Sequence, residues 1–230
     1  MTRSVPALTA ALATLAVGLT SSHAVGPDQS KAEFSDPTDI DNRYDPLTEF
    51  DRCVLRGKED GAHVRVVRKP LNRTKRFTHN GELVRAAVIR DSEFEDGELV
   101  ERTFDYFAQD DRGTVWYLGE DVNEIEDGKV VGHGGAWLYG KDTNRMGVGM
   151  PAHPQVGSRW RHEDVPDGPF ESDKVVAILG EATVRGKTYH DVLKVRERTK
   201  DEVEFKLYAP GVGNIQERPP DGRLGLVGCN

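Results

Sequence analysis

Residues 97–131 combine alternating apolar and polar residues with tight-turn signals, and this stretch constrains the fold most strongly. Two apolar-rich runs, 104–108 and 115–118, flank the sequence Asp110-Asp111-Arg112-Gly113. Aspartate favours the corner of a turn, and glycine accepts the positive φ that a hairpin turn needs. The stretch therefore predicts a central β-hairpin around which the rest of the chain is organised.

Turn signals continue along the chain and divide it into short segments of period two. Asp96-Gly97 and Asp127-Gly128 are two-residue hairpin signals, and further turns are expected at 57–61, 186–187 and 200–201. No window shows a convincing helical stripe of period 3.6. We therefore expect an all-β fold, a single antiparallel meander that forms a curved sheet, a half-barrel or a sandwich, with little helix.

The expected strand at residues 99–109 has two chemically different faces. One face is mostly apolar and carries Val100, Phe104, Tyr106 and Ala108. The other face is polar and carries Glu101, Thr103 and Asp105. Such alternation is typical of an antiparallel sheet with one buried and one solvated side. We therefore expect the apolar set to be buried and the polar set to face water.

The first 24 residues have the pattern of a signal peptide. Arg3 precedes an apolar stretch of about thirteen residues at 7–19, and Ser22-His23-Ala24 fits a cleavage site. The stretch is too short to span a bilayer, and a buried N-terminal helix is the alternative. We expect cleavage near Ala24 and a secreted or periplasmic location. No later run approaches the length of a membrane span.

After the signal peptide, the sequence predicts one leader and one domain. Residues 25–46 are rich in Asp, Pro, Ser and Asn, which favours an extended or disordered leader. Residues 47–230 are expected to form a single β-rich domain. Removal of the signal leaves 230 − 24 = 206 residues, a length that suits one domain with a sizeable core.

Charge argues against a nucleic-acid partner. The net charge is −8, and phosphate contacts need clustered Lys and Arg. The one basic cluster, at 65–76, is interpreted as a solvated strand–loop–strand face, with residues 70–73 as the loop. We expect no nucleic-acid binding.

The chain has two cysteines, Cys53 and Cys229. In an exported protein the environment is oxidising, so a disulfide that ties the two ends of the domain together is plausible. Two unpaired thiols are the alternative. The spacing matches no zinc motif.

Two sets of residues are candidates for binding. A ligand pocket would use five aromatic residues, which could equally form a packed core: Phe104, Tyr106, Trp116, Trp137 and Trp160. A metal site would use four residues in or beside the glycine-rich stretch 132–157: His133, His153, His162 and Glu163. Imidazole and carboxylate are zinc or copper ligand types, but the spacing fits no compact motif, and surface or capping roles are the alternative. No other cofactor is expected.

The run Phe-Asp-Tyr-Phe-Ala-Gln-Asp-Asp-Arg-Gly-Thr-Val-Trp-Tyr-Leu-Gly-Glu-Asp (104–121) resembles the signature of a family of uncharacterised exported bacterial proteins. Further matching segments are 42–47, 150–157, 189–193 and 208–213. The resemblance implies a secreted or lipid-anchored protein with no established catalytic residues. The chain departs from the family pattern at Cys53, where an aromatic residue is more usual, and at Arg145 and Met146.

A second, weaker similarity concerns residues 191–195 and 208–213, which resemble the closing strands of half-barrel lipid carriers of the LolA kind. This similarity implies a curved antiparallel sheet around an apolar ligand.

The sequence supports two functional hypotheses. No Gly-x-Ser-x-Gly elbow is present, and Gly132-x-Gly134-Gly135 is not followed by a predicted helix. The first hypothesis is an extracytoplasmic, non-catalytic binding protein for an apolar or amphipathic ligand, such as a lipid, with residues 132–157 covering the mouth. The second is a secreted metal-binding protein or metal-dependent enzyme that uses the histidines of residues 132–163.

Overall fold

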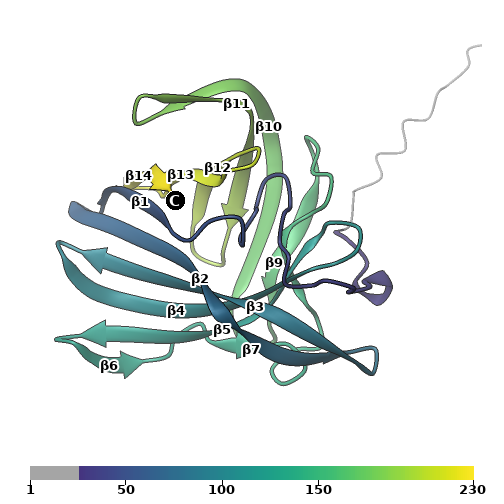
Figure 1. The fold of residues 1–230 in the computed structure, drawn as a ribbon. Coiled ribbons are helices and arrows are strands. Elements are labelled where there is room, and N and C mark those ends of the chain that lie inside the picture. Colours follow the sequence, from purple (N-terminus) through teal and green to yellow (C-terminus); the bar gives the residue numbers. More distant parts are fainter. Residues whose placement is uncertain (1–25) are drawn as a thin grey trace, which may run out of the picture.

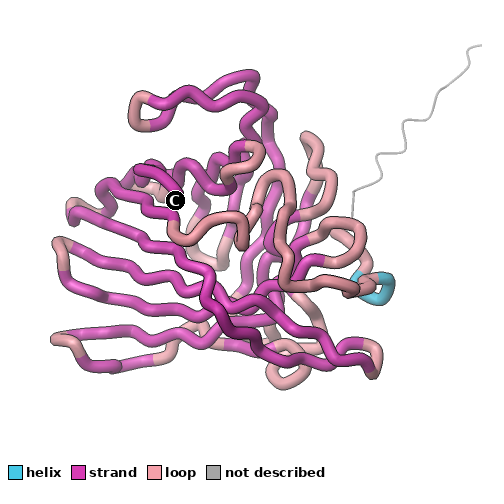
Figure 2. Tube along the Cα trace, in the orientation of Figure 1, coloured by secondary structure: helices cyan, strands magenta, loops and turns pink. Residues whose placement is uncertain are grey.

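A computed structural model describes residues 26–230 (Figures 1 and 2), so the predicted signal peptide lies outside the described residues. The chain forms one large antiparallel sheet of fourteen strands that curves without closing. The only helix in this part of the chain is the three-residue 3₁₀ turn η1 (Gln29–Lys31). The predicted all-β curved sheet with little helix is confirmed. Between residues 26 and 230 no helix is long and apolar enough to cross a membrane.

Strand order follows the chain, with one non-local junction. The first group of strands is β1 (Cys53–Glu59), β2 (Ala62–His79), β3 (Glu82–Glu95), β4 (Glu98–Gln109), β5 (Val115–Glu126) and β6 (Lys129–Gly132). The second group is β9 (Arg159–Asp164), β10 (Phe170–Val184), β11 (Lys187–Arg198), β12 (Val203–Ala209), β13 (Gly213–Arg218) and β14 (Gly222–Cys229). The two groups meet where β1 pairs with β14.

The glycine-rich stretch between these groups contains two short strands, β7 (Trp137–Leu138) and β8 (Gly147–Met150), which both pair with β5. Strand β8 also lies against β9. A Cβ atom on Gly147 would come within 1.9 Å of the carbonyl oxygen of His162, so only glycine permits this approach. The approach brings β9 close to the central strands of the sheet.

Five hairpins turn on two residues that both have positive φ, as a type I′ turn requires. They are Asp60-Gly61, Asn80-Gly81, Asp96-Gly97, Asp127-Gly128 and Arg185-Gly186. The β10–β11 hairpin is long and bends over strands β12–β14 (Figure 1). Its tip packs on β14, since a Cβ on Gly225 would lie 3.0 Å from the Cγ1 atom of Val184.

Residues 70–73, which the sequence predicts as a loop, instead lie within β2. Pro70 pairs with Ile89, and a shift in register between Leu71 and Thr74 marks a bulge. Strand β1 pairs with β2 only as far as Arg68, so Pro70 lies where β2 has one neighbouring strand. Proline is tolerated at such edge positions and at bulges, because no ladder hydrogen bond from its nitrogen is needed.

The described part of the predicted leader, residues 26–46, is irregular and packs against the sheet. Ile40 is fully buried, and the hydroxyl of Tyr44 donates to the carbonyl of Asp191 at 3.1 Å. The side-chain amide of Asn42 donates to the carbonyl of Gly113 at 2.7 Å. The segment therefore contributes to the main hydrophobic core, which also contains Trp116.

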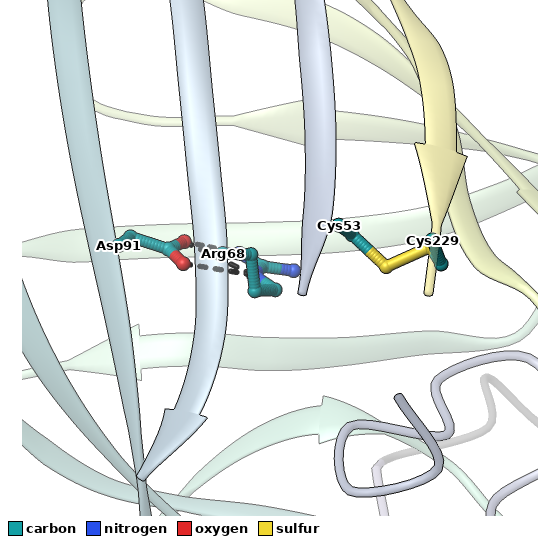
Figure 3. The surroundings of a disulfide bond; sticks show 4 residues. All are labelled: Cys53, Arg68, Asp91 and Cys229. Carbon is teal, nitrogen blue, oxygen red and sulfur yellow. Dashed lines mark hydrogen bonds and ion pairs between the residues drawn. A yellow bond between two sulfur atoms is a disulfide. The ribbon is translucent and has the colours of Figure 1, made fainter. Parts of the chain in front are cut away.

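A disulfide joins Cys53 and Cys229, which lie directly opposite each other on β1 and β14. It therefore fastens the two groups of strands at the non-local junction. Arg68 and Asp91 continue the same row across β2 and β3, where the guanidinium and the carboxylate form an ion pair of 2.6 Å (Figure 3).

Candidate functional site

A cleft of about 860 Å³ opens on one face of strands β2–β5. Its wall carries three basic side chains, two aromatic rings and several polar groups. They are Arg73, Thr74, Lys75, Arg76, Val88, Phe104, Tyr106, Asp121, Val122, Asn123, His133 and Ala136. Both the volume and the mixture of apolar and polar groups suit a small-molecule site.

Alternation along β4 places the two rings in the cleft. Phe104 and Tyr106 are two residues apart, so their side chains project from the same side of the strand. Val88 lies directly opposite Tyr106 on β3 and adds an apolar surface beside it. Arg73 belongs to the two-residue bulge of β2, and a bulge is a common device for redirecting a side chain.

The basic side chains lie over the rings. The guanidinium carbon of Arg73 is 4.7 Å from the ring centre of Phe104, and Nζ of Lys75 is 4.4 Å from that of Tyr106. These are cation–π distances. Lys75 also approaches a carboxylate oxygen of Asp121 at 3.4 Å. Within residues 26–230, Arg73 forms no ion pair, so its charge lies over the ring of Phe104 without a carboxylate partner.

Hydrogen bonds fix the positions of two further side chains in the wall of the cleft. The hydroxyl of Tyr106 donates to Asp121, and burial together with this hydrogen bond raises the pKa of Tyr106, so the phenol stays neutral. His133, from the glycine-rich stretch, approaches the carbonyl of Val122 at 2.6 Å through Nδ1. That carbonyl can only accept, so Nδ1 donates this hydrogen bond.

Of the five aromatic residues predicted for a pocket, Phe104 and Tyr106 line this cleft and the three tryptophans do not. Trp116 and Trp137 are almost fully buried and donate through Nε1 to Asp110 and Glu163, at 2.9 and 2.8 Å. Trp160 is also buried, and it lines a smaller cavity of about 350 Å³ beside β9, β10 and β11.

The structure separates the three histidines predicted for a metal site. His133 lines the cleft, His153 is exposed, and His162 lies on β9 beside two carboxylates of β10, Glu171 and Asp173. Sequence reasoning did not select Glu171 and Asp173. Their spacing of two residues in a strand, which places both on one face, was the available signal.

The opposite face of β4 does not face water, contrary to the prediction from alternation. Thr103 and Asp105 are only 5% and 7% exposed, because this side of the sheet turns toward the interior. The hydroxyl of Tyr117 donates to Asp105 at 2.8 Å. Burial and the nearby charge of Asp91 raise the pKa of Asp105 to about 7, despite the opposing effect of Arg68. One strand therefore supplies both the aromatic cleft and a buried polar interior.

Comparisons of the chain with models of protein families, with curated proteins and with solved structures found no significant match.

Proposed function

We propose that this protein is an extracytoplasmic, non-catalytic binding protein that holds a small amphipathic anion in the cleft between β2 and β5. The observation that carries the proposal is the pairing of an aromatic floor with basic residues in one cleft of about 860 Å³. An apolar part of the ligand would contact Phe104, Tyr106 and Val88, and its anionic group would lie near Arg73, Lys75 and Arg76.

The charge distribution favours an anion over a cation or a neutral molecule. Arg73 has no competing carboxylate within the described residues, and arginine forms bidentate hydrogen bonds with carboxylate and phosphate groups. Asp121 is already engaged by Tyr106 and Lys75. The net charge of the chain is −8, so the basic residues of the cleft are a local departure from the overall charge.

Two features support the remaining parts of the proposal. The glycine-rich stretch 132–157, predicted to cover the mouth of a binding site, contributes His133 and Ala136 to the wall of the cleft. The Cys53–Cys229 disulfide is of the kind that persists in oxidising compartments, which supports an extracytoplasmic location.

Titration calorimetry with three ligands of equal chain length and different head groups tests the ligand class: dodecanoate, dodecanol and dodecyltrimethylammonium. We expect dodecanoate to bind with a one-to-one stoichiometry and at least about tenfold more tightly than dodecanol, a difference of about 1.4 kcal/mol. The ammonium compound is expected to bind most weakly.

The same titration at raised salt provides a control. Attraction between an exposed anion and the basic side chains is screened by salt, whereas the apolar contribution is not. The difference in affinity between dodecanoate and dodecanol should therefore become smaller as the salt concentration increases. Equal affinity for all three compounds, or a preference for the cation, would contradict the proposal.

A further inference from the structure

A second site lies apart from the cleft, on the β9–β10 hairpin. Glu171 and Asp173 are two residues apart in β10, so both carboxylates point to one side of the strand. His162 sits opposite them on β9, at an irregularity in the pairing: Glu163 pairs with Glu171 and Arg161 pairs with Ser172, which leaves His162 as the extra residue. Such a bulge re-aims a side chain, here toward the carboxylates.

The three side chains meet without bonding directly. The Nδ1 atom of His162 lies 3.8 Å from an oxygen of Glu171 and 3.7 Å from an oxygen of Asp173. These separations are too long for hydrogen bonds. One candidate ligand atom from each residue lies within 4.8 Å of the other two.

Two polar atoms of these residues are buried and have no hydrogen-bond partner within the described chain: Nδ1 of His162 and Oδ1 of Asp173, whereas Oδ2 of Asp173 is the oxygen that approaches His162. The side chain of Asp173 is only 2% exposed, and an unpaired polar atom at such a position is costly. A metal ion with ligand distances of about 2.0–2.2 Å spans ligand pairs up to about 4 Å apart. The distances from His162 to the two carboxylates, 3.8 and 3.7 Å, therefore match a shared cation.

Glu163 adds a further carboxylate beside His162. Glu197 pairs with Asp173 across β10 and β11, but its charge is already engaged by Nζ of Lys206 at 2.7 Å.

We propose that His162, Glu171 and Asp173 bind one divalent transition-metal cation. One imidazole and two carboxylates are a donor set that Zn²⁺ accepts, and three protein ligands leave a coordination position for water. The set keeps His162 from the sequence-based hypothesis and replaces His133, His153 and Glu163 by the two carboxylates of β10. The site is separate from the cleft and does not depend on the function proposed for it.

The test is a Zn²⁺ titration of untagged, chelator-treated full-length protein against a chromophoric competitor. We expect one equivalent of Zn²⁺ to bind to the wild type and to His153→Gln, the matched control, since His153 is exposed. His162→Gln and Asp173→Asn should bind at least about 100-fold more weakly, because each loses a ligand.

Thermal unfolding with and without Zn²⁺ separates loss of the site from loss of the fold. The wild type should gain stability on adding Zn²⁺, and a folded His162→Gln variant should not. If a variant of a buried residue does not fold, Glu171→Gln replaces it, because that side chain is 18% exposed. Absence of stoichiometric binding by the wild type, or unchanged binding by folded His162→Gln, would overturn the proposal.

Discussion

At the scale of single residues, Glu93 on β3 lies directly opposite Glu101 on β4. Burial, and after it the charge of Glu101, raise the pKa of Glu93 to about 7. A carboxyl whose pKa is raised in the folded state binds protons more tightly there than in the unfolded chain. The free energy of unfolding should therefore fall as pH rises from about 4.5 to about 7.

Glu93→Gln should remove this loss. At pH 8 we expect the variant to be more stable than the wild type by about 1–2 kcal/mol, with solvent screening limiting the gain, and to match it near pH 4. Urea unfolding at the two pH values measures the difference. Glu95→Gln, an exposed position on the same strand, serves as the control and should change little. A Glu93→Gln variant that is less stable than the wild type at pH 8 would refute this account.

The same scale shows where alternation misleads. Phe104, Asp105 and Tyr106 do alternate between two faces of β4, as predicted. Alternation alone, however, cannot say which face is covered. Asp105 is buried in the interior of the curved sheet, whereas Phe104 is only partly buried and lines the cleft. The burial of the polar face depends on the curvature of the sheet and on packing from distant strands. The alternation of residues along one strand predicts neither of these.

At the scale of elements, the sequences of the two-residue turns predicted the hairpins directly. Asp96-Gly97 and Asp127-Gly128 form hairpins with positive φ at both residues, as their sequences predict. The bulge of β2 was not readable, because Pro70 and Asn72 are equally typical of a loop. That bulge contains Arg73, one of the basic residues of the cleft. The bulge that contributes Arg73 to the cleft therefore also gave this segment the sequence pattern of a loop.

The pairing of β1 with β14 joins two strands that are far apart in the sequence. The disulfide between them links cysteines that are 176 residues apart. On a chain-entropy model, closing a loop of this length stabilises the fold by about 5 kcal/mol. We expect Cys53→Ser/Cys229→Ser to lower the free energy of unfolding by about 3–5 kcal/mol, measured by urea unfolding. Reductant should produce the same loss in the wild type and none in the double variant. A wild type that is unaffected by reduction would contradict this role.

At the scale of the whole molecule, the all-β curved sheet and the pairing of Cys53 with Cys229 could both be predicted from the sequence. The binding surface could not, because it joins residues that are distant along the chain. Arg73 and Lys75 belonged to a basic cluster interpreted as a solvated face, while Phe104 and Tyr106 were assigned to an aromatic set with three tryptophans. Only the pairing of β2, β3 and β4 brings the two groups together.

Removing the charges that lie over the cleft rings tests anion binding at this site directly. Calorimetric titration of dodecanoate into Arg73→Gln/Lys75→Gln should show at least about tenfold weaker binding than in the wild type, with unfolding midpoints compared to verify the fold. Arg65→Gln is the matched control, since Arg65 lies 3.7 Å from the ring centre of Phe94 but outside the cleft. We expect this control to bind dodecanoate like the wild type. Unchanged affinity in the double variant, or an equal loss in Arg65→Gln, would contradict anion binding at this site.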